Sequence, residues 1–268
     1  MNLSRWYGLT TRLAAREVAL RYRGSLGGLG WMLLAPLLLL GVYTFVFAVI
    51  FHARWPAAGG GGGTTGTGTT GEYALVVFSG MLLHGFFAEC LTRAPTLVLG
   101  NVNFVQKTVF PLEVLAVAQL LAALVHLAAT LAVLLVFQWF IQGPPALTTL
   151  LLPLVIAPVA LFALGLMWIV GALTVYFRDL AQLVGLLVTA LFFLSPVLYP
   201  ISAVPEFLRP LLYANPLTFA IETARGLLFA GVLPEPRAYL LYCLTALACA
   251  GAGLWGFRVL RDGFADAL

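Results

Sequence analysis

Side chains that could act as a general base or bind a metal ion are few in this 268-residue sequence, and they are scattered. The histidines are His52, His84 and His126. A hydrolase or transferase would need a nucleophile beside a base, or a cluster of histidines and acids around a metal ion. His84 and Glu89 are five residues apart, which places them on different faces of a helix. The sequence therefore predicts no catalytic residues and no metal site.

Other polar side chains are spaced to interact within or between helices. His126 shares a helical face with Gln119 and Thr130, at spacings of seven and four. Such a stripe more often forms hydrogen bonds between membrane helices than it lines a pore, and the pore-lining alternative stays open. The cysteines, Cys90, Cys243 and Cys249, show neither a disulfide framework nor the spacing of metal ligands.

Two charged pairs have helical spacing. Glu89 precedes Arg93 by four residues, which favours an ion pair over a proton relay. Glu222 precedes Arg225 by three, and this pair fits either a structural or a gating role.

The high hydrophobic content of the chain indicates that most of it lies in a lipid bilayer and not in water. Hydrophobic residues make up 62% of the chain and charged residues 9%, against about a quarter charged in soluble domains. Since about 20 apolar residues cross a bilayer as one helix, we expect an all-α integral membrane protein, one domain over 1–268. Its six predicted transmembrane helices are 31–53, 73–92, 114–142, 148–177, 180–199 and 237–257. Pro153 and Pro158 predict a kink or a broken start in the fourth.

The positive charges predict the orientation. Of the 14 Lys and Arg residues, ten fall on one side of these spans and four on the other. Positive residues stay on the cytoplasmic side, so an even number of spans places both termini in the cytoplasm. The net charge of +4 follows the membrane in this way and forms no basic groove for nucleic acid.

An amphipathic helix is predicted over residues 4–23, before the first span. One face carries Arg5, Arg12, Arg16 and Arg23, which fall within about 40° of one another. Trp6 and three leucines form the adjoining stripe. This pattern is typical of a helix in the headgroup layer, and the alternative is a solvated positive flank that only sets topology.

Two further segments lie outside the spans. The glycine-rich stretch 54–72 lacks the Gly-Lys-Ser/Thr of a phosphate loop and is predicted to be an outer loop. The stretch 200–236 holds six prolines, is too polar to span and too apolar for a free linker. Two short helices that dip into the outer half of the membrane would satisfy its pattern.

Several motifs resemble one known family. They are Tyr176-Phe177-Arg178-Asp179-Leu180, Phe192 to Pro200, Asn215-Pro216-Leu217, Ile221 to Gly226, Phe78-Ser79-Gly80 and Phe110-Pro111-Leu112-Glu113. Together they resemble the membrane permeases of ABC-2 type exporters, in particular the branch that exports O-antigen, teichoic acid and capsular polysaccharide. His84 departs from this pattern, because a tryptophan is frequent there, and so does Gln106, where a basic residue is usual.

The resemblance assigns roles to residues. It implies a coupling helix within 94–106 that contacts an ATPase, with Pro95, Asn101, Val102, Asn103 and Phe104. It implies a second contact at the turn that holds Arg178 and Asp179. It makes 200–236 outer gate helices, with gate residues Ser195, Pro196, Tyr199, Asn215, Pro216, Glu222 and Arg225.

The expected partners follow. Since the chain has no Gly-x-x-x-x-Gly-Lys-Ser/Thr loop, it has no cofactor of its own, and a partner ATPase would bind ATP and magnesium. Two permease copies with two ATPase chains would enclose a pore on a two-fold axis. Aromatic rings suit a sugar-conducting pore, and the candidates are Tyr43, Phe47, Phe192 and Phe193.

The expected function is therefore export of a lipid-linked, O-antigen-like polysaccharide across the cytoplasmic (inner) membrane of a bacterium, with no nucleic-acid partner and no enzyme activity in this chain. The first alternative is an ABC-2 exporter of drugs or other small hydrophobic compounds. A stand-alone ion-coupled transporter is disfavoured because no span offers a carboxylate at mid-membrane. A membrane-embedded transferase would have to use His84 or His126.

Overall fold

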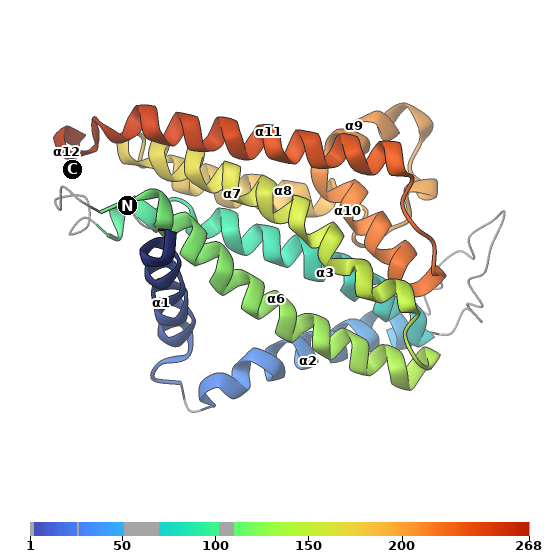
Figure 1. Cartoon of the computed structure of the whole chain (residues 1–268). Coiled ribbons are helices and arrows are strands. Elements are labelled where there is room, and N and C mark those ends of the chain that lie inside the picture. The colour runs from blue at the N-terminus through green and yellow to red at the C-terminus, as the bar shows by residue number, and fades with distance from the viewer. Residues whose placement is uncertain (1–2, 26, 51–69, 102–109, 268) are drawn as a thin grey trace.

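The computed structural model describes residues 3–25, 27–50, 70–101 and 110–267, and all regular secondary structure in these ranges is helical (Figure 1). The long helices are α1 (Leu3–Tyr22), α2 (Trp31–Tyr43), α3 (Thr70–Arg93), α6 (Glu113–Gln142), α7 (Leu152–Tyr176), α8 (Leu180–Phe193) and α11 (Pro236–Arg261). The short helices are α4 (Thr96–Leu99), α9 (Arg209–Ala214), α10 (Pro216–Arg225) and α12 (Phe264–Ala267). Short 3-10 or π-helical turns are η1 (Gly28–Gly30), η2 (Thr44–Ile50), η3 (Leu147–Leu151), η4 (Ile201–Ala203), η5 (Glu206–Leu208) and η6 (Gly226–Ala230). The predicted all-α class is confirmed.

Five helical segments in the described ranges are long and apolar enough to cross a membrane. They are Gly28–Val46, Gly71–Arg93, Glu113–Gln142, Leu147–Tyr176 and Pro236–Arg261. The remaining predicted span, 180–199, corresponds to α8, which has 14 residues. A helix of that length rises about 21 Å, less than the hydrocarbon thickness of a bilayer. Within the described residues there are thus five helical segments long enough to span and one short apolar helix, where six full spans were predicted.

Local sequence explains where the spans begin and end. The fourth begins with the 3-10 turn η3, and α7 follows with Pro153 in its first turn and Pro158 inside. The start is therefore irregular but continuous, since η3 leads directly into α7. Pro153 is tolerated in the first turn of the helix, whereas Pro158 removes a hydrogen bond further in. The first span continues from α2 into the π-helix η2. Its last three predicted residues, 51–53, lie outside the described ranges.

Small residues allow the helices to pack closely. α3 runs through the middle of the bundle and is the most buried span, whereas α7 and α11 lie alongside each other (Figure 1). A Cβ atom on Gly165 of α7 would lie 2.5 Å from the carbonyl oxygen of Cys249 on α11, and one on Gly253 would collide with Gly165. Backbone contact of this kind is how membrane helices gain packing energy without a hydrophobic driving force.

Both termini lie at the same end of the bundle, which we call the near end (Figure 1). α1 lies across this end at a steep angle to the spans and packs against α6. An orientation of this kind is the one required of a helix in the headgroup layer. α9 and α10 lie towards the opposite end, which we call the far end.

Candidate functional site

The backbone leaves helical geometry at the far end, directly after α8. The helix ends at Phe193, and a tight turn follows in which the Val197 N–H donates to the Ser195 carbonyl oxygen at 2.7 Å. Pro196 and Pro200 cannot donate backbone hydrogen bonds, so the helix cannot continue through them. Carbonyl groups freed in apolar surroundings must find partners within the protein.

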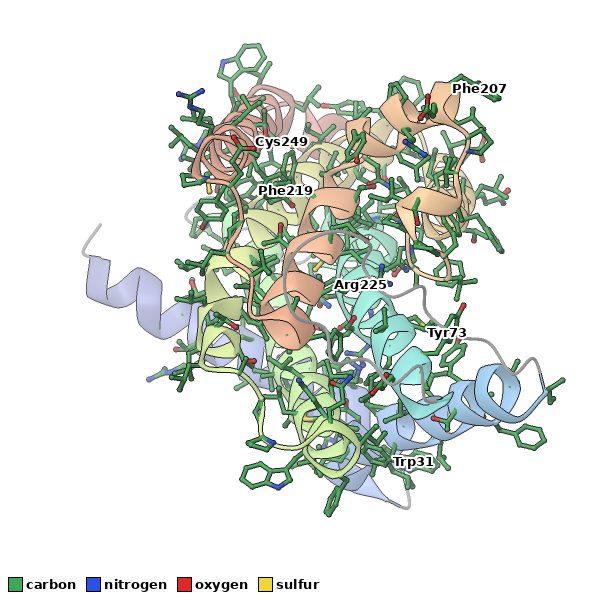
Figure 2. All side chains as sticks on the ribbon, turned by 90° about the vertical axis from the view of Figure 1, so that its right-hand side faces the viewer. Trp31, Tyr73, Phe207, Phe219, Arg225 and Cys249 are labelled. Atoms are coloured by element: carbon green, nitrogen blue, oxygen red, sulfur yellow. The ribbon has the colours of Figure 1, made fainter. Side chains whose placement is uncertain are left out.

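Arg225 of α10 supplies these partners. Its side chain is buried, and Nη1 donates to the Pro196 carbonyl oxygen at 2.6 Å. Nη2 donates to the carbonyl oxygens of Val197, at 2.9 Å, and of Val76 on α3, at 3.2 Å. Figure 2 looks onto the far end and labels Arg225 together with Tyr73 of α3. One guanidinium group therefore joins α10, α3 and the turn after α8.

Glu222 lies one helical turn before Arg225. Its Oε1 is 3.1 Å from Arg225 Nη1, which confirms the ion pair predicted from their spacing. The Glu222 side chain is 44% exposed, whereas that of Arg225 is 8% exposed. The partly exposed Glu222 carboxylate thus balances the positive charge of Arg225, and the buried N–H groups of the guanidinium donate to backbone carbonyl oxygens.

α3 fits against the same turn through a glycine and a tyrosine. A Cβ atom on Gly80 would lie 2.9 Å from Arg225 Nη2 and 3.2 Å from the Cα atom of Val197. The Tyr73 hydroxyl donates to the Leu198 carbonyl oxygen at 2.8 Å. Only a residue without a side chain allows α3, the turn and the guanidinium group to meet here.

Asn215 completes this network. Its Oδ1 accepts from the Leu217 N–H at 2.9 Å and caps α10, and Pro216 occupies the first turn. Its Nδ2 donates to Ser195 Oγ at 2.8 Å. The Tyr199 hydroxyl donates to the Phe193 carbonyl oxygen at 2.7 Å. We call the predicted gate residues together the far-end cluster: Ser195, Pro196, Tyr199, Asn215, Pro216, Glu222 and Arg225.

The described parts of the segments predicted to contact an ATPase lie at the near end (Figure 1). In the first, Pro95 is buried before α4, and Asn101 Nδ2 donates to the Leu97 carbonyl oxygen at 3.0 Å. α4 packs against α7, where a Cβ atom on Gly171 would lie 3.2 Å from the Ala94 carbonyl oxygen. The rest of this segment, Val102, Asn103 and Phe104, lies outside the described residues. Arg178 and Asp179 are exposed at the turn between α7 and α8.

α1 is attached to the bundle by an ion pair that the sequence did not reveal. Arg21 Nη1 lies 2.5 Å from Glu89 Oε1 of α3. The expected pair of Glu89 with Arg93 is therefore wrong, because Arg21 of α1, which is distant in sequence, forms the ion pair with this carboxylate.

A second contact joins α1 to the bundle. The Tyr22 hydroxyl lies 3.2 Å from His126 Nδ1, and burial raises the pKa of Tyr22, which keeps the phenol protonated. His126 thus joins α6 to α1, as the helix-joining interpretation of its polar stripe expects.

A second unforeseen ionic group ties α6 to α11. Glu113, at the start of α6, lies 3.0 Å from Arg261 and 3.5 Å from Arg258. The Trp168 indole donates to the Glu113 carbonyl oxygen at 3.1 Å. Glu113 is the last residue of the Phe110-Pro111-Leu112-Glu113 motif. Its partner Arg261 is 148 residues further along the chain, so helical spacing could not identify this ion pair.

The predicted interface and pore residues are placed only in part. Arg12, Arg16 and Arg23 are exposed on or next to α1, and the side chains of Arg5, Trp6 and Phe47 lie outside the described set. Tyr43 is half-buried at the end of α2.

On α8, Phe193 is 63% exposed, whereas Phe192 is half-buried against His84 at a ring distance of 5.1 Å. His84 Nε2 lies 3.2 Å from the Val188 carbonyl oxygen, so this histidine joins α3 to α8. Among the described residues, no three His, Cys, Asp or Glu side chains are grouped to hold a metal ion.

The described residues thus form an all-helical bundle of membrane-spanning helices, with one helix across its near end and a non-helical turn at its far end. The chain matches the family described as ABC-2 type transporter over residues 9–229, and it belongs to that family. It is 26% identical over 268 residues to an "O-antigen export system permease protein RfbA" of Klebsiella pneumoniae, covering 100% of this chain and 97% of the relative. It is 27% identical over 269 residues to a protein of the same name from Myxococcus xanthus, covering 100% and 98%.

Proposed function

We propose that this chain is the permease subunit of an ABC exporter that moves a lipid-linked, O-antigen-like polysaccharide out of the cytoplasm. The observation that carries this proposal is the end-to-end similarity to O-antigen export permeases, which covers 100% of this chain. The family match, over residues 9–229, begins within α1 and extends past the far-end cluster, so it covers segments at the near end and at the far end of the bundle.

A separate ATPase would power transport. The sequence has no phosphate-binding loop, so ATP and its magnesium ion would be bound by the partner chain. Two features of the near end support a docking surface there. α4 packs against α7, and the exposed Arg178 and Asp179 lie in the turn directly before α8. Movement of the ATPase against this surface would thus reach α7 and α8 together.

Two copies of the chain would form the complete pathway. Two-fold symmetry is the commonest arrangement among soluble homo-oligomers, and here it would place two ATPase chains beneath two permeases. The excess of Lys and Arg at the end that holds both termini supports a cytoplasmic near end in the inner membrane. Tyr43, Phe47, Phe192 and Phe193 remain the candidates for apolar contact with sugar rings.

The far-end cluster would act as the outer gate. Arg225 fixes the turn after α8 to α3 and α10 through three carbonyl oxygens, so these elements can only move together or by breaking those bonds. An outward-opening step would therefore move α10 as one unit with the turn and α3, or would break the bonds of Arg225.

Deletion of the gene in its own host tests the function. We expect surface polysaccharide to be lost, with the lipid-linked polymer retained inside the cell, and a plasmid copy to restore it. A deletion strain with normal surface polysaccharide and raised sensitivity to hydrophobic drugs would instead identify a drug exporter.

A further inference from the structure

Two adjoining cavities lie at the near end, between α1 and the bundle. The smaller, of about 20 Å³, is bounded by α1, α3 and α6 together with the start of α2. The larger, of about 60 Å³, extends from α1 and α6 towards α4. Three residues line both: Glu17, Arg93 and Gln119. Each cavity has room for at least one water molecule, so small polar groups can enter. We call the two together the α1 pocket.

Gln119 forms the inner wall of this pocket. The residue is only 7% exposed, and none of the hydrogen bonds found among the described residues involves its amide group. An amide that lines a cavity can hydrogen-bond a ligand or water there, and its NH2 group provides two donors. The amide is therefore available to an occupant that accepts hydrogen bonds.

The charges around the pocket favour an anion. Arg21 and Glu89 both line the smaller cavity and form an ion pair at 2.5 Å, so their charges cancel. Arg16 and Arg93 line the larger cavity, and in the described part of the chain neither guanidinium group takes part in an ion pair. Glu17 is the one carboxylate left on the wall. Two guanidinium groups and an amide offer the donors that a phosphate group, with its several acceptor oxygens, binds best.

The position of the pocket suits a phosphate at a membrane surface. It opens beside α1, whose exposed arginines follow the pattern of a headgroup-layer helix. We propose that the α1 pocket binds a phosphate group, carried by a lipid headgroup of the adjacent leaflet or free in solution. An occupant of the larger cavity would also touch Thr96 and Asn101 of the segment around α4. This inference does not depend on which compound the permease exports.

Native mass spectrometry of the full-length chain in mild detergent tests the proposal. The probes are phosphatidylglycerol and diacylglycerol with identical acyl chains, which differ in the phosphate-containing headgroup. We expect wild-type protein to retain phosphatidylglycerol, and Arg16→Gln or Arg93→Gln to weaken retention about tenfold, since a charge-assisted hydrogen bond is lost. Arg237→Gln is the matched control, because Arg237 is exposed at the start of α11 and lines neither cavity.

A competition arm identifies the source of the phosphate. Inorganic phosphate that displaces phosphatidylglycerol, and stabilises wild-type protein against heating but not Arg93→Gln, would support a site for free phosphate. Retention that resists inorganic phosphate would support a lipid site. Equal retention of diacylglycerol and phosphatidylglycerol, or variants at Arg16 and Arg93 that behave like Arg237→Gln, would overturn the proposal. Arg16 and Arg93 are exposed, so these variants are expected to fold.

Discussion

The guanidinium group of Arg225 donates to the carbonyl oxygen of Pro196 at 2.6 Å, and this bond joins α10 to the point where α8 ends. The break in α8 and the buried charge on α10 depend on each other. The turn needs donors because Pro196 and Pro200 interrupt the helix, and the charge needs acceptors because its side chain is 8% exposed.

Replacement of Arg225 should therefore cost more than replacement of its ion-pair partner. Arg225→Met leaves the Pro196 and Val197 carbonyl groups without their donor, and we expect a loss of about 3 kcal/mol or more in stability. Glu222→Gln should cost under about 1 kcal/mol, because the Glu222 side chain is 44% exposed. Thermal unfolding of the purified variants in detergent measures both. Equal losses would mean that the ion pair, not the carbonyl network, holds the turn.

The contact of α7 with α11 should tolerate no side chain at Gly253. Gly253→Ala places a methyl group against the Gly165 backbone, and we expect a cost of about 1–3 kcal/mol as the helices separate. Gly256→Ala on the same helix meets nothing within 4 Å and should be neutral or stabilising. The same thermal measurement compares the two. A neutral Gly253→Ala variant would show that the helices are less tightly packed.

The spans were predictable because apolar runs between charges are a strong signal. The predicted segments 73–92, 114–142 and 237–257 lie within α3, α6 and α11, respectively. α8 was predicted to continue to residue 199 because Leu194 to Tyr199 is apolar, yet it ends at Phe193. Hydropathy does not register the prolines that end a helix, so composition overestimates the length of this span.

The side-chain partners were less predictable, because helical spacing reveals only neighbours on the same helix. The pair of Glu222 with Arg225 was found this way and is confirmed. Glu89 also has an arginine four residues on, but its partner is Arg21, which is 68 residues earlier. A tertiary contact of this kind depends on where α1 docks, and no local pattern encodes it.

The Arg21 and Glu89 pair should behave as an energetic unit. In a double-mutant cycle of Arg21→Gln and Glu89→Gln, we expect a coupling energy of about 1 kcal/mol or more, because the Glu89 side chain is 10% exposed. The control cycle of Arg93→Gln with Glu89→Gln should show little coupling. Thermal unfolding in detergent at low salt provides the values. Coupling to Arg93 instead of Arg21 would restore the pair expected from spacing.

Contact with the ATPase should depend on the turn between α7 and α8. Arg178→Glu and Asp179→Lys reverse exposed charges at the start of α8, so we expect stability to change by no more than about 1 kcal/mol but export-coupled ATP hydrolysis to be lost in the assembled complex. Arg237→Glu, an exposed charge at the start of α11, is the matched control on the far side. Assays of ATP hydrolysis and export in the same membranes check this. Normal coupling in both reversed variants would remove this turn from the docking surface.

The most direct measurement is polymer export by purified components. The permease and its co-purifying ATPase are reconstituted in vesicles that carry the lipid-linked polysaccharide, with the near end and the ATPase facing the outer solution. An enzyme that digests the polysaccharide is added outside at each time point. Transport should move polymer into the vesicle lumen, so the digestible fraction should fall only with ATP and with both proteins present. A fraction that stays constant with ATP, or falls equally without the permease, would contradict the proposed function.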